Sequence, residues 1–146
     1  MENSYHKNYY KSITEGLTNS TFCIDSIDTS GELFFQEVNN LLLEIKKKIK
    51  RIYCFGNGAS AAFANHMALD FSKNGKILSR SLSDSAMLTA ISNDYSYDAA
   101  MVEFLKIEGV SSEDIVITIS SSGNSPNIVN VLKHCKNNNL KSLQGY

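Results

Sequence analysis

The sequence predicts an α/β fold built around a parallel β-sheet. Short apolar runs, rich in β-branched residues, alternate along the chain with segments whose apolar residues recur at helical spacing. No hairpin signal joins one of these runs to the next. Strands that alternate with helices in this way pair in parallel and are connected by right-handed crossovers.

Length and composition are those of one domain with a substantial core, because 42% of the 146 residues are hydrophobic and 20% are charged. A net charge of −1 and a pI near 6.3 give no electrostatic reason to expect nucleic acid or an anionic membrane as a partner. No apolar run reaches the length of a membrane-spanning helix, and the N-terminus lacks the form of a signal peptide. Cys23, Cys54 and Cys135 form no Cys-x-x-Cys pattern and indicate reduced thiols in a cytoplasmic protein, two of them as core filler.

Residues 1–50 are expected to be helical and to form a segment distinct from the α/β core at residues 51–146. Apolar and aromatic residues at helical spacing predict a first helix that breaks at residues 19–20, and a capping box of Thr29 and Glu32 predicts the start of a second. Cations at the end of the second helix complement its dipole, with a nucleic-acid patch as the alternative. Its apolar stripe, wide enough to cover one face of the sheet and also meet another subunit, consists of Phe34, Phe35, Val38, Leu41, Leu42, Ile45 and Ile49.

The remaining elements are expected to alternate. They are a strand over 52–55, a helix over 61–72, a strand over 77–82, a helix over 84–91, a polar turn at 92–95, a helix over 98–107, a strand over 115–119, a helix over 126–136 and a strand beginning at 140–143. A last strand without a covering helix leaves apolar surface bare. We therefore expect that the chain is a fragment of a longer one or that another subunit covers this face.

The junction after residues 115–119 is suited to binding an anion. Three serines, Gly123, Asn124 and Ser125 follow the strand, and Pro126 begins a helical pattern. Ser125 suits the N-cap and Pro126 the first helical position. Free N–H groups, hydroxyls and the positive end of the helix dipole meet there, and such a place binds a phosphate. The alternative is an ordinary polar loop with a cap.

The junction after residues 52–55 reads Gly56-Asn57-Gly58-Ala59-Ser60 and lies at the sheet edge where open α/β sheets bind ligands. The third glycine of a dinucleotide fingerprint is missing, and no acidic residue follows a second strand to hold a ribose. Nucleotide binding is therefore not expected.

His66 and Asp70 stand four residues apart on the helix expected over 61–72, so their side chains share one face. The two side chains suit a pair of metal ligands or a proton-transfer pair. A surface pair that slightly stabilises the helix is the alternative. No Gly-x-Ser-x-Gly elbow supports a serine hydrolase.

Three stretches together resemble the signatures of the sugar isomerase (SIS) domain family. They are Gly56-Asn57-Gly58-Ala59-Ser60-Ala61-Ala62 followed by His66, then Asn93-Asp94-Tyr95, then Ser120-Ser121-Ser122-Gly123-Asn124-Ser125. The chain is most similar to the phosphoheptose isomerase branch, which converts sedoheptulose 7-phosphate into D-glycero-D-manno-heptose 7-phosphate. From about residue 30 onward, the resemblance implies a three-layer αβα fold of the flavodoxin type. It also implies N-terminal helices that build a homotetramer and a role in lipopolysaccharide or capsule synthesis.

The resemblance implies a role for each matching residue. His66 matches a zinc-binding histidine of some family members, and Asp70 matches a glutamate that acts as base and metal ligand. Zinc is therefore a candidate cofactor, held by the same two residues that are candidates for catalysis. Contacts to the phosphate or sugar are implied for Asn57, Gly58, Ser60, Asp94, Ser120, Ser121, Ser122 and Ser125.

The implied reaction, ketose–aldose isomerisation, needs a carboxylate base, a second acid/base group and stabilisation of an enediolate. Asp70 is one methylene shorter than glutamate, which places its carboxylate roughly 1–1.5 Å short. The family's other acid/base histidine and its companion glutamine lie on a C-terminal segment that residues 1–146 do not contain. Two hypotheses follow: an isomerase seen as a shortened chain, or a non-catalytic SIS module that binds a phosphosugar or serves as a regulatory or assembly partner.

Overall fold

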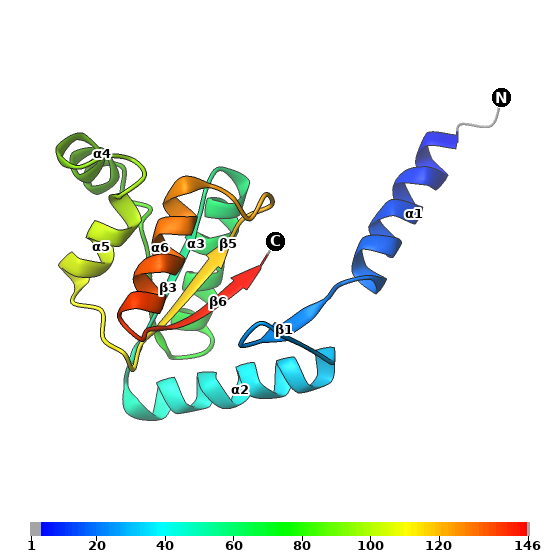
Figure 1. Ribbon diagram of the computed structural model, residues 1–146, viewed down its shortest axis with the longest axis horizontal. Helices are drawn as coiled ribbons and strands as arrows, with labels where there is room; N and C mark the ends of the chain where they lie inside the picture. The colour runs from blue at the N-terminus through cyan, green and yellow to red at the C-terminus, as the bar shows by residue number, and fades with distance from the viewer. Residues whose placement is uncertain (1–3, 146) are drawn as a thin grey trace. The chain divides into compact units, whose positions relative to one another are not determined.

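A computed structural model describes residues 4–145 and divides the chain into two compact units, Met1–Leu42 and Leu43–Tyr146 (Figure 1). The division falls inside helix α2 (Gly31–Lys48), whereas the sequence placed the boundary after residue 50. The last turns of α2 belong to the second unit because Ile45 is buried there and Glu44 accepts a hydrogen bond from Lys141 Nζ at 3.3 Å.

The first unit begins with helix α1 (Ser4–Thr18), which ends next to the expected break. The expectation that residues 1–50 are helical on both sides of a break at residues 19–20 is wrong for residues 22–29. Strands β1 (Phe22–Ile24) and β2 (Ile27–Thr29) form an antiparallel hairpin. Its two turn residues, Asp25 and Ser26, have φ values of 51° and 67°, as a primed turn requires. Neither residue is glycine, so the turn lacks the Asn-Gly or Asp-Gly pair that marks such a hairpin in a sequence.

The start of α2 also differs from the expectation. Thr29 lies in β2, and the Ser30 hydroxyl accepts a hydrogen bond from the Leu33 N–H at 3.2 Å, so Ser30 is the residue that caps the helix. Ile49, expected on the apolar stripe, follows the helix end with a φ of 55° and is 76% exposed.

The second unit contains a parallel sheet with the strand order β4-β3-β5-β6. This confirms the predicted α/β class. The strands are β3 (Arg51–Gly56), β4 (Leu78–Ser81), β5 (Ile115–Ile119) and β6 (Lys141–Gly145). The connecting helices are α3 (Ala59–Lys73), α4 (Ser85–Asp94), α5 (Ala100–Glu108) and α6 (Pro126–Asn137).

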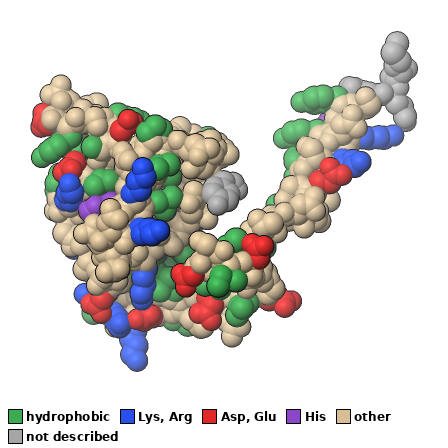
Figure 2. All heavy atoms as spheres, viewed as in Figure 1, with side chains coloured by type: hydrophobic (Ala, Val, Ile, Leu, Met, Phe, Trp, Pro, Cys, Tyr) green, Lys and Arg blue, Asp and Glu red, His purple; other side chains and the backbone are tan. Residues whose placement is uncertain are grey.

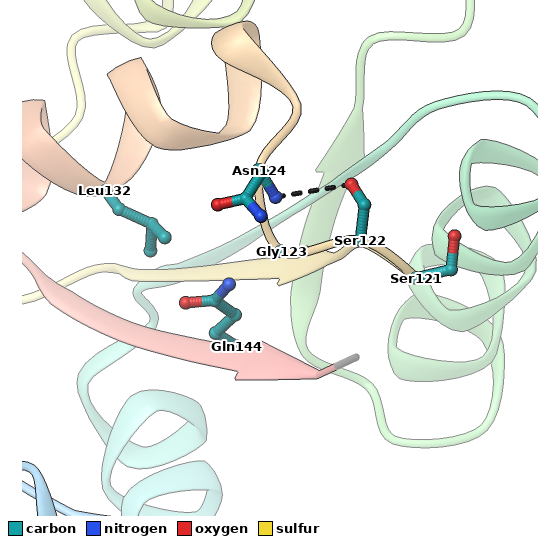
Figure 3. Close-up of a pocket in the computed structure, with 6 residues that line it drawn as sticks. All are labelled: Ser121, Ser122, Gly123, Asn124, Leu132 and Gln144. Atoms are coloured by element: carbon teal, nitrogen blue, oxygen red, sulfur yellow. Dashed lines mark hydrogen bonds between the residues drawn. The ribbon is translucent and has the colours of Figure 1, made fainter.

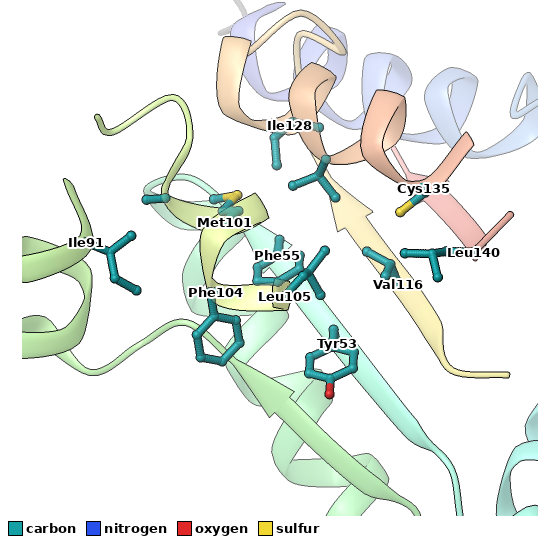
Figure 4. Close-up of a cluster of buried hydrophobic side chains, with 12 residues drawn as sticks. Tyr53, Phe55, Ile91, Met101, Phe104, Leu105, Val116, Ile128, Cys135 and Leu140 are labelled. Atoms are coloured by element: carbon teal, nitrogen blue, oxygen red, sulfur yellow. The ribbon is translucent and has the colours of Figure 1, made fainter. Parts of the chain in front are cut away.

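Helices cover the two faces of this sheet. Tyr53 and Phe55 of β3 and Val116 of β5 point to one face, where they join residues of α5 and α6 in the main core cluster (Figure 4). Buried alanines of α3 lie outside this cluster, and α3 packs on the other face. The central strands are thus apolar on both sides, as expected for parallel strands.

Cys54 and Cys135 are both buried, and neither forms a disulfide. Burial raises the pKa of Cys54 to about 12 and that of Cys135 to about 11, so both remain protonated thiols that fill the core. The expectation that two of the cysteines are core filler is confirmed.

Helix α4 runs further than expected. Asp84 caps its start, because Asp84 Oδ1 accepts a hydrogen bond from the Met87 N–H at 2.8 Å. The helix continues to Asp94, so residues 92–94, expected in a polar turn, form its last turn instead. Among residues 4–145, no helix combines the length and the apolar character needed to cross a membrane.

Asp114, directly before β5, joins the starts of the two central strands. It is only 6% exposed, and its carboxylate accepts hydrogen bonds from the N–H groups of Arg51 and Ser111 and from the Ser111 hydroxyl, each at 2.8 Å. One buried carboxylate is therefore the hydrogen-bond acceptor for three donors.

The Asp114→Ala change should lower the free energy of unfolding by about 2–4 kcal/mol, because it leaves three partly buried donors without their acceptor. Urea denaturation measures the loss. Asp114→Asn, which retains one acceptor oxygen, should lose less. Glu113→Ala, which removes a neighbouring exposed ion pair to Lys50, should cost less than about 1 kcal/mol. Equal losses in Asp114→Ala and Glu113→Ala would contradict this role of Asp114.

Candidate functional site

The loop between β5 and α6, residues 120–125, lies at the carboxyl edge of the sheet and is held by backbone hydrogen bonds. The Ser120 N–H donates to the carbonyl of Gly145 in β6 at 2.9 Å, and the Gly123 N–H donates to the Ser120 carbonyl at 3.2 Å. Gly123 has a φ of 65°, which glycine adopts without strain. The chain therefore turns sharply back toward the start of α6.

A hollow of about 560 Å³ opens beside this loop (Figure 3). Ser121, Ser122, Gly123 and Asn124 line it together with two residues from neighbouring elements, Leu132 of α6 and Gln144 of β6. The Ser122 hydroxyl accepts a hydrogen bond from the Asn124 N–H at 3.2 Å. Among the residues that the structure describes, the polar groups lining the hollow are neutral hydroxyls, amides and backbone groups. They can hold an anion by hydrogen bonds but cannot titrate.

Ser125 and Pro126 occupy the N-cap and the first turn of α6, as the sequence predicted. The Ser125 hydroxyl makes no capping hydrogen bond. Instead, the Ile128 N–H is taken by Asn127 Oδ1 at 3.0 Å. Among the described residues, the Ser125 hydroxyl therefore has no hydrogen-bond partner, and it stands at the positive end of the helix dipole.

Of the four serines expected to contact phosphate, Ser121 and Ser122 are exposed and line the hollow. Ser120 is only 5% exposed and lies outside the lining, at the base of the turn, while Ser125 stands at the helix start.

The loop after β3 is shaped by a close approach of its backbone to α3. A Cβ on Gly56 would lie 2.5 Å from the carbonyl carbon and oxygen of Ser60, so only glycine fits there. Gly58 has a φ of 54° and takes the N-cap position, and α3 begins at Ala59, two residues earlier than expected. Ser60 consequently lies in the first turn of the helix, half-buried.

Asn57 joins this loop to the start of α6. Its side-chain amide pairs with that of Asn127 through two hydrogen bonds of 2.9 and 2.8 Å, and its Oδ1 also accepts from the Tyr97 hydroxyl at 2.9 Å. Sequence reasoning assigned no role to Asn127 or Tyr97. In the sequence, the only indication of a role for Asn127 was its position beside the apolar residues of the helix expected over 126–136. In the structure, Asn127 is 2% exposed.

His66 and Asp70 do share one face of α3, with His66 Nε2 3.4 Å from Asp70 Oδ2. Their side chains are 72% and 50% exposed, and Asp70 Oδ1 also accepts from Asn74 Nδ2 at 3.1 Å. No group of three His, Cys, Asp or Glu side chains able to hold a metal occurs within residues 4–145. Two ligands are half of a tetrahedral zinc shell, so the described residues do not by themselves fit a closed zinc site.

Asp94 ends α4, where its Oδ1 accepts from the Asn93 side-chain amide at 3.2 Å. The hydrogen bonds between Asn57 and Asn127 thus join the loop after β3 to the start of α6, which directly follows the loop at residues 120–125. Within the described part of the chain, no hydrogen bond or ion pair joins His66, Asp70 or Asp94 to these loops.

Curated relatives are similar in sequence to this chain over most of its length. It is 38% identical over 125 residues to a phosphoheptose isomerase from Thermodesulfovibrio yellowstonii, covering 77% of the chain and 62% of that relative. It is also 38% identical over 114 residues to phosphoheptose isomerase 1 from Campylobacter jejuni, covering 73% of the chain and 60% of that relative. The chain therefore spans about three fifths of the length of these relatives.

Solved structures show the same fold. A phosphoheptose isomerase from Neisseria gonorrhoeae superposes with a TM-score of 0.74 at 25% identity, covering 98% of this chain and 73% of that one. The family model described as SIS domain matches residues 17–142, which contain both strand-to-helix loops and the helix with His66 and Asp70. The chain belongs to the SIS domain family.

Proposed function

We propose that this chain binds a phosphorylated sugar, with the phosphate in the hollow beside residues 120–125. We propose further that it forms the larger part of an aldose–ketose isomerase of the phosphoheptose isomerase type, acting on sedoheptulose 7-phosphate. The observation that carries the proposal is a hollow lined by the Ser121 and Ser122 hydroxyls and by the backbone of the loop that leads into the start of α6. The names of the curated relatives support the choice of substrate.

Phosphate suits this place for a physical reason. Ser121 and Ser122 present hydroxyls, Ser125 adds a third at the N-cap, and the first turn of α6 supplies the positive end of the helix dipole. Binding energy gained at the phosphate can hold the distant reacting carbons of the sugar in position.

In the isomerase hypothesis, Asp70 removes a proton beside the substrate carbonyl and His66 acts as its acid/base partner. Asn57, Gly58 and Ser60 contact the sugar, and Asp94 contacts its polar chain. Zinc would be held by His66 and Asp70 with ligands from elsewhere, and when bound it would polarise the carbonyl. The described residues supply only two of its ligands.

A homo-oligomer, with a tetramer favoured, is part of the same proposal. Helix α1 buries none of its residues, and its apolar side chains lie open on its surface (Figure 2). Tyr5, Tyr9, Ile13 and Leu17 are between 43% and 74% exposed at helical spacing. A second copy of the chain would cover such a stripe. An enzyme of this kind would act in the cytoplasm, in lipopolysaccharide or capsule synthesis.

A non-catalytic phosphosugar-binding module is the second candidate, and one observation favours it. Within residues 4–145, no titratable side chain lines the hollow, while His66 and Asp70 are largely exposed on α3. Conversion of sedoheptulose 7-phosphate by the purified chain would decide for the isomerase. Binding without conversion would decide for the module if the protein tested is the product of the complete reading frame, because a shortened isomerase would also bind the sugar phosphate without converting it.

Sedoheptulose 7-phosphate should raise the melting temperature of the chain, because a ligand that binds only the native state stabilises it. At 100 times the dissociation constant the stabilisation amounts to about 2.7 kcal/mol. Differential scanning fluorimetry measures the shift. Inorganic phosphate should give a smaller shift, and sedoheptulose without phosphate should give none. Equal shifts with and without the phosphate group would contradict the placement of the anion.

A further inference from the structure

The two asparagines that join the strand-to-helix loops form a closed amide pair. Asn57 Nδ2 donates to Asn127 Oδ1 at 2.9 Å, and Asn127 Nδ2 donates back to Asn57 Oδ1 at 2.8 Å. The partners are 70 positions apart in the chain. Asn127 is buried to 2% exposure, whereas Asn57 is only half-buried and therefore the member that a ligand can reach.

A backbone group sets the polarity of this pair. The Ile128 N–H can only donate, and it lies 3.0 Å from the Asn127 oxygen, so this atom of the Asn127 amide has to be the acceptor. The Asn127 nitrogen then faces Asn57, and the atom that it meets has to be the Asn57 oxygen. The Tyr97 hydroxyl donates to that same oxygen at 2.9 Å.

This arrangement uses up most of the hydrogen-bonding capacity of Asn57. An asparagine side chain has one oxygen that accepts two hydrogen bonds and one nitrogen that donates two. Asn127 and Tyr97 occupy the oxygen, and Asn127 takes one N–H. Among the described residues, the second N–H of Asn57 has no partner, so one donor and no acceptor remains for a ligand.

We propose that Asn127 is a positioning residue, which locks Asn57 so that it meets the ligand only as a hydrogen-bond donor. The ligand atom at this point is then an acceptor oxygen of a phosphate, a carbonyl or a sugar hydroxyl, and a hydroxyl there does not donate to Asn57. This inference rests on the proposed phosphosugar site and deepens it. Tyr97 supports the same orientation from the segment between α4 and α5.

Binding of sedoheptulose 7-phosphate to four variants tests the proposal by titration calorimetry. Asn57→Ala and Asn127→Leu should each weaken binding about tenfold, the effect of losing one good hydrogen bond. The double variant should be no weaker than Asn57→Ala alone, because Asn127 acts through Asn57. Asn130→Leu is the matched control: it removes another α6 asparagine, which bonds the Asp98 carbonyl, and should leave affinity within twofold.

An effect of Asn127 on binding that is independent of Asn57 would give additive losses in the double variant and would overturn the inference. A role of Asn127 in stability alone would leave the affinity of Asn127→Leu unchanged, which would overturn it as well. Tyr97→Phe adds a graded control, because it removes one donor to the Asn57 oxygen but leaves the amide pair intact. It should change affinity less than threefold.

A second measurement on the ligand-free protein separates this inference from the proposed function. In the NMR spectrum, the bonded Asn57 side-chain proton should be shifted downfield relative to the protons of the exposed Asn39, and Asn127→Leu should remove that shift. If the wild type binds no sedoheptulose 7-phosphate but the shift is present, the proposed function fails and the locked amide stands. If the shift is absent from the wild type, the inference fails whatever the ligand does.

Discussion

Changing Ser121 to glutamate should abolish the binding of sedoheptulose 7-phosphate. The new carboxylate would stand at the lining of the hollow, close to the proposed phosphate, and would replace a hydroxyl donor. Two like charges about 4 Å apart repel by about 4 kcal/mol at the effective dielectric of a protein surface, which corresponds to a loss of more than a hundredfold. Titration calorimetry at fixed ionic strength measures the affinity.

Two further variants separate the effect of the added charge from the effect of the lost hydroxyl. Ser112→Glu makes the same change at an exposed serine in the loop before β5, at the other edge of the sheet, and should leave the affinity within twofold. Ser121→Ala removes the hydroxyl without adding charge and should weaken binding by about fivefold to tenfold. If Ser121→Glu bound the sugar phosphate as well as Ser112→Glu does, the phosphate would have to lie elsewhere.

The Gly56→Ala change should lower the free energy of unfolding by about 2–4 kcal/mol. The added Cβ would lie 2.5 Å from the Ser60 carbonyl carbon and oxygen and 2.8 Å from the Ala61 nitrogen. These are backbone atoms of the first turn of α3, so no side-chain rotation relieves the clash. The loop or the helix has to move, and Asn57 moves with it. Urea denaturation measures the loss of stability.

Gly145→Ala is the matched control, because nothing lies within 4 Å of the position a Cβ would take and the backbone there does not have a positive φ. Its free energy of unfolding should stay within about 0.5 kcal/mol of the wild type. If Gly56→Ala were as stable as Gly145→Ala, the close approach of β3 and α3 would not be needed for the fold.

The sequence predicted the α/β core well because its local signals agreed with the tertiary structure. The apolar run at 115–119 forms β5 with the expected bounds, and Ser125 and Pro126 begin α6 as expected. At Asp94 the local sequence signal and the observed structure differed. The polar residues before it suggested a turn, but α4 continues through them because an exposed helix end tolerates polar side chains.

The hairpin and the amide pair escaped prediction for different reasons. Asp25 and Ser26 adopt positive φ without glycine, so composition gave no sign of a tight turn. Asn127 acts through a partner that is 70 positions away, and no periodicity or spacing rule in one sequence connects two such residues. The sequence therefore identified residues that line the hollow but not the residue that orients Asn57.

Adjacent strands β3 and β5 bring these distant positions together, while β4, which lies between them in the chain, pairs on the outer side of β3. Such non-local pairing is entropically costly and slows folding, so the two loops acquire their shape only once the central strands have paired. A partly folded chain consequently does not form the proposed anion site. A sugar phosphate held there lengthens the lifetime of the native protein by slowing its unfolding, and it leaves the rate of folding unchanged.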